Sequence, residues 1–549
     1  MSESKQLVWL ITGTSTGIGR CLTLAALKRG DRVIATARAR SISQLADLQA
    51  QGADVLQLDV TDTPDNLKEI AKKAVAIHGR VDVVVNNAGY AIISAIEEYT
   101  QEESLQQFNT NFFGGLNIAR AFLPYMRERK SGTILWIGSV AGWTQQPSFG
   151  MYSSTKYAIR GISETLDAEI AHLGLRSITV ELGYFNTNVI PNRIPYVNRI
   201  ADYQNSIVTQ TSGFLDGYHG HEPGDPIKGA EAIADLVHGE GFAGGREIPP
   251  TVGFGSDYLI IYFHNPSYDV RNQTTAGLAN HWHFEWYWSM LNAGCSQARR
   301  PVIATARARS ITQLADLATQ GADILQLDVT DSLDNIKKIA KKAIALHGRV
   351  DVVVNNAGYA VIGGIEECTP EESLQQFNTN FFGALNVARA FLPYMRERRS
   401  GTIVWIGSVA AWTPSVSFGI YSATKYAMRG LSETLNTEIA HLGLRSITVE
   451  LGYFRTNMIV NRTSYVNRIA DYKEVITKAD KYLNHEPGDP AKAGEAIVDL
   501  VRGEGLAKEK QIRTTIGLGS DYYVDTTKSC EGTRTALVEW ESFSRSTDF

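Results

Sequence analysis

The chain has 549 residues, of which 44% are hydrophobic and 20% are charged, and its formal net charge is −5. This length is too great for one ordinary core and is typical of two domains. The balanced charge excludes a basic nucleic-acid surface, and no apolar run approaches the length of a membrane span. We therefore expect a globular protein that acts on a small molecule, without nucleic acid or membrane as a partner.

The first residues run directly into a strand-like segment, without the apolar core or the cleavage site of a signal peptide. The four cysteines are scattered, and no pair has the spacing of a metal site: Cys21, Cys295, Cys368 and Cys530. Such isolated cysteines are read as reduced thiols, which are typical of cytosolic proteins. The sequence thus predicts a cytoplasmic protein without a metal.

Strand-like and helix-like segments alternate in the first half of the chain. Short apolar runs predict buried strands at 7–11, 32–37, 55–58, 81–85, 133–138, 177–182 and 248–254. Helical spacing covers 17–28, 64–78 and 104–127, and a further long helix begins near residue 149. This alternation predicts an α/β fold of the Rossmann type, a doubly wound parallel sheet with helices on both faces.

A glycine-rich loop connects the first predicted strand to the first helix, with Gly13, Gly17 and Gly19 in the spacing Gly-x-x-x-Gly-x-Gly. Glycines at this place let the backbone turn tightly and approach a pyrophosphate, which then lies on the helix N-terminus. The loop therefore predicts a dinucleotide site, although a glycine loop on its own could be a simple turn.

The second predicted strand ends at Ala37 and Arg38. NAD-binding proteins usually carry a carboxylate here for the ribose 2′-hydroxyl, whereas arginine suits a 2′-phosphate. Arg38, with help from Ser15 in the glycine loop, therefore favours NADP. The alternative is that Arg38 and Arg40 are solvated loop charges.

Tyr152 and Lys156 are four residues apart on the long helix, so their side chains share one face. A neighbouring ammonium group favours the phenolate and lowers the pKa of a tyrosine. On this basis Tyr152 is a candidate proton donor and acceptor near neutral pH. Taken alone, the pair is more often part of a solvated helix face.

Further polar residues follow the glycine loop in order: Asp59, Asn86-Asn87-Ala88-Gly89, Asn111, Ser139 and then Tyr152 and Lys156. This ordered set resembles the classical short-chain dehydrogenase/reductase family. The segment Val-Glu-Leu-Gly-Tyr-Phe and the terminal Ser-Thr-Asp-Phe549 are similar to a fungal, retinol-dehydrogenase-like branch. Singly, Ser139 could be a strand-end cap, Asn111 a structural amide and Asp59 a turn residue.

The resemblance implies a role for each matched residue. Tyr152 is the implied general acid in reduction and the base in oxidation, and Lys156 lowers its pKa and binds the nicotinamide ribose. Ser139 polarises the substrate carbonyl, and Asn111 holds a water that links Lys156 to solvent. The implied cofactor-binding residues are Gly13, Ser15, Gly17, Ile18, Gly19, Arg38, Asp59, Val60, Asn87, Ala88, Gly89, Tyr152, Lys156, Gly183 and Thr187. Leu182 departs from the family, which usually has proline before Gly183, and this leaves the nicotinamide loop less rigid.

The chain also repeats itself. Residues 101–120 and 370–389 are identical at 17 of 20 positions, at an offset of 269. The second copy begins recognisably only at Val302, so it lacks the first strand and the glycine loop. It retains counterparts of the catalytic set and of part of the cofactor surface: Asn380, Ser408, Tyr421, Lys425, Arg307, Asp328 and Asn356. We therefore expect two tandem Rossmann-type sheets, of which the second is incomplete, binds cofactor poorly and is inactive.

The repeat predicts a complete domain at 1–258, an aromatic-rich irregular linker at 259–299 and a truncated domain at 300–549. The linker is too aromatic for a flexible spacer and too long for a loop, so two adjacent genes read as one are an alternative explanation. A rescue of the second sheet is conceivable, with 258–263 in the vacant strand position and 285–292 as a surrogate helix.

Together these features predict an NADP(H)-dependent oxidoreductase that interconverts an alcohol and a ketone or aldehyde in the first copy. The alternatives are an epimerase or dehydratase with the same Tyr/Lys pair, and a non-catalytic NADP-binding scaffold. Residues 186–220 are the expected substrate lid, and an apolar pocket is expected from Tyr90, Trp143, Phe149, Tyr184 and Phe185. The family often dimerises through the helices of Asn111 and Tyr152, so we expect either a homodimer or pairing of the two copies within the chain.

Overall fold

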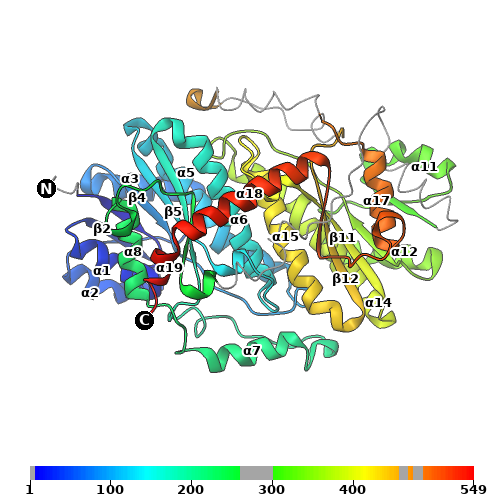
Figure 1. Cartoon of the computed structure of the whole chain (residues 1–549), viewed down its shortest axis with the longest axis horizontal. Coiled ribbons are helices and arrows are strands. Elements are labelled where there is room, and N and C mark those ends of the chain that lie inside the picture. Colours follow the sequence, from blue (N-terminus) through cyan, green and yellow to red (C-terminus); the bar gives the residue numbers. More distant parts are fainter. Residues whose placement is uncertain (1–5, 260–300, 457–467, 474–485) are drawn as a thin grey trace.

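The computed structural model describes residues 6–259, 301–456, 468–473 and 486–549. The two copies lie side by side, and one long helix near the C-terminus runs across both of them (Figure 1). The predicted linker, 259–299, lies outside the described residues except for its first residue, and so do 260–263 and 285–292 of the conceivable rescue. Residues 256–259 are helical, so the described start of that stretch does not form a strand.

The first copy contains a seven-stranded parallel sheet in the order β3-β2-β1-β4-β5-β6-β7. The chain order reverses between β1 and β4, and this switch point is where doubly wound sheets bind dinucleotides. The predicted Rossmann-type fold is confirmed. The strands are β1 (Val8–Ile11), β2 (Arg32–Ala37), β3 (Asp54–Gln57), β4 (Val83–Asn86), β5 (Gly132–Ile137), β6 (Leu175–Leu182) and β7 (Thr251–Phe254).

Helices cover both faces of this sheet. On one face α1 (Gly17–Lys28) and α8 (Pro226–His238) share a core with the strands. The other face is covered by α3 (Pro64–His78), α5 (Gly114–Arg129) and α6 (Gly150–Ile170), whose core continues into the second copy. The remaining helices of this copy are α2 (Ala46–Ala50), α4 (Gln101–Phe108) and α7 (Ile207–Tyr218).

The described part of the second copy repeats the elements of the first from β2 onward, but its sheet is divided. β8 (Ile303–Ala306) pairs with β9 (Asp323–Gln326), while a separate sheet has the order β10-β11-β12-β13. In the first copy β1 pairs with both β2 and β4, which joins the corresponding parts. No strand of the described residues joins β8 to β10, because the sequence that would form it is missing. The other strands are β10 (Val352–Asn355), β11 (Gly401–Ser408), β12 (Leu444–Leu451) and β13 (Thr515–Leu518).

The described helices of the second copy correspond to α2–α6 and α8 of the first, and two further helices follow them. They are α11 (Ala315–Thr319), α12 (Leu333–His347), α13 (Pro370–Phe377), α14 (Ala384–Arg398), α15 (Gly419–Ile439), α17 (Pro490–Arg502), α18 (Ser520–Glu539) and α19 (Glu541–Arg545). α18 is the helix that runs across both copies, and it brings α19 and the C-terminus to the first copy (Figure 1).

The two copies pack against each other through α6 and α15, and equivalent residues make reciprocal contacts. A Cβ on Gly161 of α6 would lie 2.6 Å from the ring of Tyr426, and one on Gly430 of α15 would lie 2.6 Å from the ring of Tyr157. Only glycine allows the helices to approach this closely at these positions. The copies therefore pair with each other within the chain, which is one of the two arrangements expected from the sequence.

Candidate active site

The glycine loop lies between the carboxyl end of β1 and the start of α1. Gly13 and Gly17 have φ of +70° and +61°, values that favour glycine. In the part of the chain that the structure describes, the Thr16 side chain does not cap α1. The first N–H groups of α1 are thus not satisfied by that side chain, and such a helix N-terminus suits an anion.

Asn87 holds the glycine loop against the end of β4. Its side-chain Nδ2 donates to the carbonyl oxygens of Thr12 and Gly13 at 2.8 and 3.1 Å. Gly19 is required behind it, because a Cβ there would lie 2.4 Å from Asn87 Nδ2. A Cβ on Gly17 would lie 3.6 Å from Thr187, so the predicted nicotinamide segment reaches the glycine loop. These residues fit a dinucleotide of the kind the sequence predicts.

Ser139, Tyr152 and Lys156 converge beside this loop. Ser139 follows β5, and its side chain is hydrogen bonded to that of Tyr152 on the first turn of α6. The Lys156 ammonium lies 5.5 Å from the centre of the Tyr152 ring and donates to the carbonyl oxygen of Ile137 at 2.7 Å. Two polar hydrogens, from a phenol and a hydroxyl, can therefore reach one substrate oxygen.

The protonation of this pair differs from the sequence prediction. Burial raises the pKa of Tyr152 to about 12, although the hydrogen bond with Ser139 opposes this shift. Burial lowers the pKa of Lys156 to about 8, against the opposing effect of the nearby Glu181 carboxyl group. The direction for Tyr152 is opposite to the predicted acidification, because desolvation outweighs the hydrogen bond with Ser139 and the nearby Glu181 and Tyr184 also raise the pKa. At neutral pH the phenol therefore carries its proton.

Asn111 lies in a π-helical turn, Asn109–Phe113, between α4 and α5. Its amide exchanges two hydrogen bonds with the backbone of Tyr90, at 2.9 and 3.1 Å, and also donates to Thr155 at 3.3 Å. π-Helical turns of this kind often occur at functional sites. The amide thus ties the segment after β4 to α6, which is what the alternative role of Asn111, a structural amide, requires.

Glu181 on β6 is a site residue that sequence reasoning missed. It is fully buried, and its Oε2 accepts a hydrogen bond from the backbone N–H of Ser139 at 2.6 Å. Burial raises the pKa of Glu181 to about 8, while Arg160 and Lys156 oppose the shift. The signal was present in the sequence, since a carboxylate inside an apolar strand is uncommon unless it is paired.

The remaining predicted cofactor residues lie around the carboxyl ends of the strands. Arg38 is exposed directly after β2. Burial raises the pKa of Tyr90, and the positive charge of Arg38 opposes this shift. Ser15 is partly exposed and Ile18 is buried in α1. Asp59 accepts hydrogen bonds from the backbone and the hydroxyl of Thr61, which makes it a turn residue as well.

Four further predicted cofactor residues, Val60, Ala88, Gly89 and Gly183, pack closely with neighbouring segments. A Cβ on Gly114 would lie 2.9 Å from Val60, and one on Gly89 would lie 3.3 Å from Asn111. A Cβ on Gly13 would lie 3.0 Å from the Cα of Ala88. Gly183 N donates to the carbonyl oxygen of Phe254 at 2.8 Å. The backbone is thus held closely where the cofactor is expected.

Two of the five aromatic residues predicted for a substrate pocket belong to the core instead. Trp143 is 1% exposed and stacks under the Arg160 guanidinium at the contact between the copies. Phe185 is 5% exposed and packs against α8. Phe149 and Tyr184 are nearer to the chemistry, since the Phe149 ring lies 5.9 Å from that of Tyr152 and the Tyr184 hydroxyl receives a hydrogen bond from Gln146. The structure describes the whole predicted lid, residues 186–220, and this segment contains α7.

Comparison with known proteins agrees with this geometry. Residues 7–195 and 294–466 both match the family model of the short chain dehydrogenases. The chain belongs to the short chain dehydrogenase family.

Several relatives resemble parts of this chain. An uncharacterized oxidoreductase of Schizosaccharomyces pombe is 36% identical over 230 residues, which are 42% of this chain and 77% of that protein. The oxidoreductase claN of Passalora fulva is 39% identical over 182 residues, which are 33% of this chain and 82% of that protein. The crystal structure of a short-chain dehydrogenase from Streptomyces avermitilis is 35% identical with a TM-score of 0.42, and the match covers 47% of this chain and 92% of that one.

The second short chain dehydrogenase copy preserves the chemical half of the site. Lys425 donates to the carbonyl oxygen of Ile406 at 2.6 Å, and Tyr421 is hydrogen bonded to Ser408. Burial raises the pKa of Tyr421 to about 12 and lowers that of Lys425 to about 8. Asn380 exchanges hydrogen bonds with Tyr359 as Asn111 does with Tyr90.

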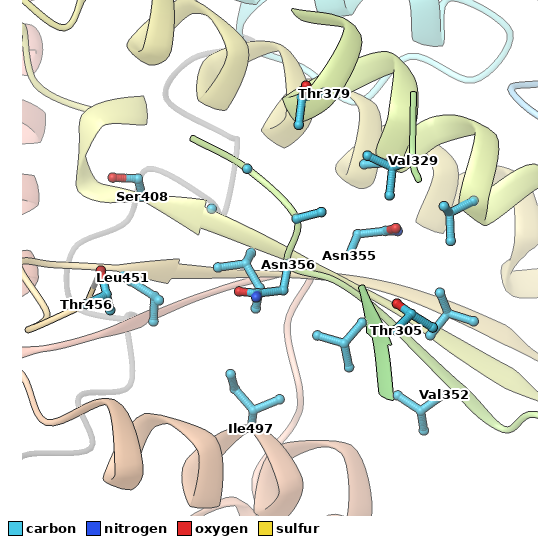
Figure 2. Close-up of a pocket in the computed structure, with 18 of the residues that line it drawn as sticks. Thr305, Val329, Val352, Asn355, Asn356, Thr379, Ser408, Leu451, Thr456 and Ile497 are labelled. Atoms are coloured by element: carbon cyan, nitrogen blue, oxygen red, sulfur yellow. The ribbon is translucent and has the colours of Figure 1, made fainter. Parts of the chain in front are cut away.

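In the second copy, a cavity lies where the first copy is expected to bind its cofactor. A space of ≈ 2430 Å³ lies where β1 and the glycine loop lie in the first copy, and its walls include Thr305 of β8 and Val352 of β10 (Figure 2). Asn356, the counterpart of Asn87, faces this cavity (Figure 2). The acceptors that Asn87 uses, Thr12 and Gly13, have no counterparts in the described second copy. Arg307 and Asp328 also lie on the cavity wall.

Each copy supplies a buried glutamate to the other. Glu438 of α15 accepts hydrogen bonds from the backbone N–H groups of Ile96 and Ser148 at 2.7 and 2.9 Å. Ser148 has φ of +73° and directly precedes Phe149, at the start of the helix that carries Tyr152. The equivalent Glu169 of α6 makes the same two bonds to Ile365 and Ser417 in the second copy. Sequence reasoning missed both glutamates, because their partners lie in the other copy.

These buried carboxyl groups predict the pH dependence of stability. Burial raises the pKa of both Glu169 and Glu438 to about 8, above the ordinary value of 4.5. The folded chain therefore holds protons that the unfolded chain has already released, and its stability should fall as the pH rises from about 4.5 to 8. Melting temperatures measured across this range should decline, and the double variant Glu169→Gln/Glu438→Gln should decline less steeply. An equal slope for the two proteins would contradict the prediction.

The described residues contain no helix that is long and apolar enough to cross a membrane. They also contain no group of three or more His, Cys, Asp or Glu side chains arranged to hold a metal ion. Cys21, Cys368 and Cys530 are free thiols, and Cys295 lies outside the described residues.

Proposed function

We propose that the chain is an NADP(H)-dependent oxidoreductase that interconverts an alcohol and a ketone or aldehyde in its first copy. The observation that carries this proposal is the convergence of Ser139, Tyr152 and Lys156 beside an intact glycine loop. NADP(H), when bound, would supply or accept the hydride. The chain's own part is to bind the substrate oxygen, to move one proton and to hold both reactants in place.

The protonation states support a division of roles. Tyr152, with its raised pKa, holds a proton at neutral pH and can donate it to a carbonyl oxygen as that oxygen gains charge. The Ser139 hydroxyl, which the Tyr152 side chain contacts, can donate a second hydrogen bond to the same oxygen. Lys156, with a pKa of about 8, supplies positive charge that stabilises the phenolate left after proton transfer. In the oxidation direction the same groups act in reverse.

The proposed substrate is an apolar carbonyl compound or the corresponding alcohol. Phe149 and Tyr184 support this class, since both are partly exposed aromatic residues close to Tyr152 and to the loop of Gln146. The second copy is proposed to be inactive, since its catalytic set adjoins a cavity instead of a pyrophosphate-binding loop.

The test is an NADPH-oxidation screen of the full chain over a panel of ketones and aldehydes. We expect NADPH consumption equal in amount to the alcohol formed. An epimerase or dehydratase would convert its substrate without net NADPH consumption, and a scaffold would bind NADPH tightly without turning over any carbonyl.

Cofactor preference provides a separate prediction. Arg38 lies at the end of β2, where an arginine can pair with a 2′-phosphate. Replacing Arg38 by aspartate should lower kcat/KM for NADPH by roughly 10- to 100-fold, because the free energy of one hydrogen bond to a charged group is lost. The ratio of kcat/KM for NADPH and NADH should shift toward NADH. Arg307→Asp, the same change in the second copy, is the matched control and should leave the ratio unaltered. An unchanged ratio in Arg38→Asp would exclude this role.

A further inference from the structure

The last residues of the chain belong spatially to the first copy, although they follow the second copy in sequence. α18 leaves β13 of the second sheet, crosses both copies and delivers α19 to the first one (Figure 1). Trp540 and Phe543 are 3% and 2% exposed there. The Phe543 ring lies 5.6 Å from Phe242 and 5.1 Å from Phe254, within the core under β7. We call residues 540–549 the C-terminal tail.

Hydrogen bonds extend this contact to the segments after β7 and before α8. Ser544 Oγ donates to the carbonyl oxygen of Gly253 at 2.5 Å, and its own carbonyl oxygen accepts from Gly255 N at 3.0 Å. Ser256 N donates to the Asp548 carboxylate at 3.2 and 3.3 Å. On the other side, Asp225 N donates to the carbonyl oxygen of Thr547 at 2.9 Å. The tail therefore holds two segments of the first copy at once.

Both of these segments support the proposed nicotinamide end of the site. Gly224 N donates to the carbonyl oxygen of Tyr184, and Asn186 N donates to that of Gly224, both at 3.0 Å. Tyr184 N donates to Asp257 at 2.6 Å, directly after the tail-bound residues that follow β7. Gly224 also bridges to Asp548, so the tail, residue 224 and residues 184–186 form three adjacent extended segments.

The second copy has the same inner pairing without the tail. Gly488 N donates to the carbonyl oxygen of Tyr453 at 3.0 Å, and Arg455 N donates to that of Gly488 at 3.1 Å. Among the described residues, Gly488 bridges to Phe454 and to no third segment. The tail thus distinguishes the first copy from the second at this end of the site.

We propose that the second copy serves the first as a built-in partner, whose C-terminal tail positions residues 183–187 for the nicotinamide and the substrate. The inference rests on the proposed function and adds to it a role for the second copy that needs no catalysis. Its residues act through the backbone of residues 223–225 and 253–257, so they are positioning residues. A first copy without the tail would expose Phe242 and Phe254 and lose the outer hydrogen bonds of both supporting segments.

The test removes residues 540–549 from the full chain. Hydrogen exchange should quicken at residues 183–187, 223–226 and 253–256, because their protecting contacts are lost. The second-copy counterparts at 452–455, 488–490 and 517–520 should exchange as before. If the screen has found a substrate, kcat/KM should fall at least tenfold. A synthetic peptide of residues 536–549, added at millimolar concentration, should restore both protection and activity.

Two further variants keep the test decisive. Asp548→Ala keeps both aromatic anchors and should quicken exchange only at 223–226 and 253–257, whereas Val538→Ala, at a residue that is 56% exposed, should change nothing. Should the truncated chain unfold, Asp548→Ala decides instead, and unchanged exchange at 223–226 and 253–257 in that variant would overturn the inference. Unchanged exchange at residues 183–187 and 223–226 in the folded truncated chain would overturn the inference. Absence of turnover in the full chain would instead remove the proposed function, and the exchange measurement would still show whether the tail holds these segments.

Discussion

Replacing Tyr152 by phenylalanine is expected to lower NADPH-dependent carbonyl reduction by roughly 10²- to 10⁴-fold, the usual contribution of a positioned general acid. The change removes one oxygen from a side chain whose raised pKa keeps it protonated at neutral pH. The Phe ring can keep the contact that Tyr152 makes with Phe149, so the fold should be unaffected. Steady-state kinetics with the best carbonyl from the screen will measure the loss, and fluorescence titration should show that NADPH still binds.

The duplication provides a matched control for this experiment. Tyr421 lies beside the equivalent Ser408 and Lys425 and has the same raised pKa, but its copy lacks the glycine loop. Tyr421→Phe should therefore retain the full rate, and the double variant should behave as Tyr152→Phe does. Residual activity in Tyr152→Phe that disappears in the double variant would show instead that the second copy is active.

Replacing Glu438 by leucine is expected to impair the first site from the opposite copy. Leucine has a similar size but no acceptor, so the N–H groups of Ile96 and Ser148 would remain buried without their partner. Each unsatisfied group costs about 1–3 kcal/mol. Because Ser148 leads directly into the helix of Tyr152, part of this cost should appear as misplacement of the phenol. A loss of about 1.4 kcal/mol in transition-state stabilisation is tenfold in rate, and we expect at least that fall in kcat/KM.

Glu169→Leu is the matched control, because it removes the same two bonds from Ile365 and Ser417 in the second copy. Both variants should lower the melting temperature to a similar extent, since the two glutamates are equally buried. Only Glu438→Leu should lower kcat/KM substantially. Equal losses of activity would indicate a general weakening of the contact between the copies, and the positioning role of Glu438 would then be wrong.

Much of the first site could be predicted because its determinants are local. The glycine loop needs φ values near +60° to +70° at Gly13 and Gly17, and the Tyr152 and Lys156 pair needs only the periodicity of one helix. α8 could also have been predicted, because Asp225 and Pro226 form a helix start and Gly239 a left-handed end.

The assignments that failed all depended on surroundings that the local sequence does not contain. Trp143 and Phe185 are aromatic residues near the site in sequence, yet their rings are buried against Arg160 and α8. Tyr152 was expected to be acidic from its spacing to Lys156, but the depth of burial decides its pKa. Both errors arise because neither position in the sequence nor spacing along a helix gives the solvent exposure of a side chain.

The sequence by itself determined the doubly wound sheet, the glycine loop, the Ser139, Tyr152 and Lys156 set and the gap in the second copy. The sheet and the loop follow from strand and helix periodicity and from glycine geometry, which act over a few residues. The Ser139, Tyr152 and Lys156 set follows from the family resemblance, and the gap follows from the comparison of the two copies. Tertiary structure alone decided that the two copies pair through α6 and α15, that Glu438 supports the loop before Tyr152, and that the C-terminal tail returns to the first copy. The reason is physical: hydrogen bonds and buried surfaces between residues hundreds of positions apart depend on how completed elements pack, and no local pattern encodes that packing.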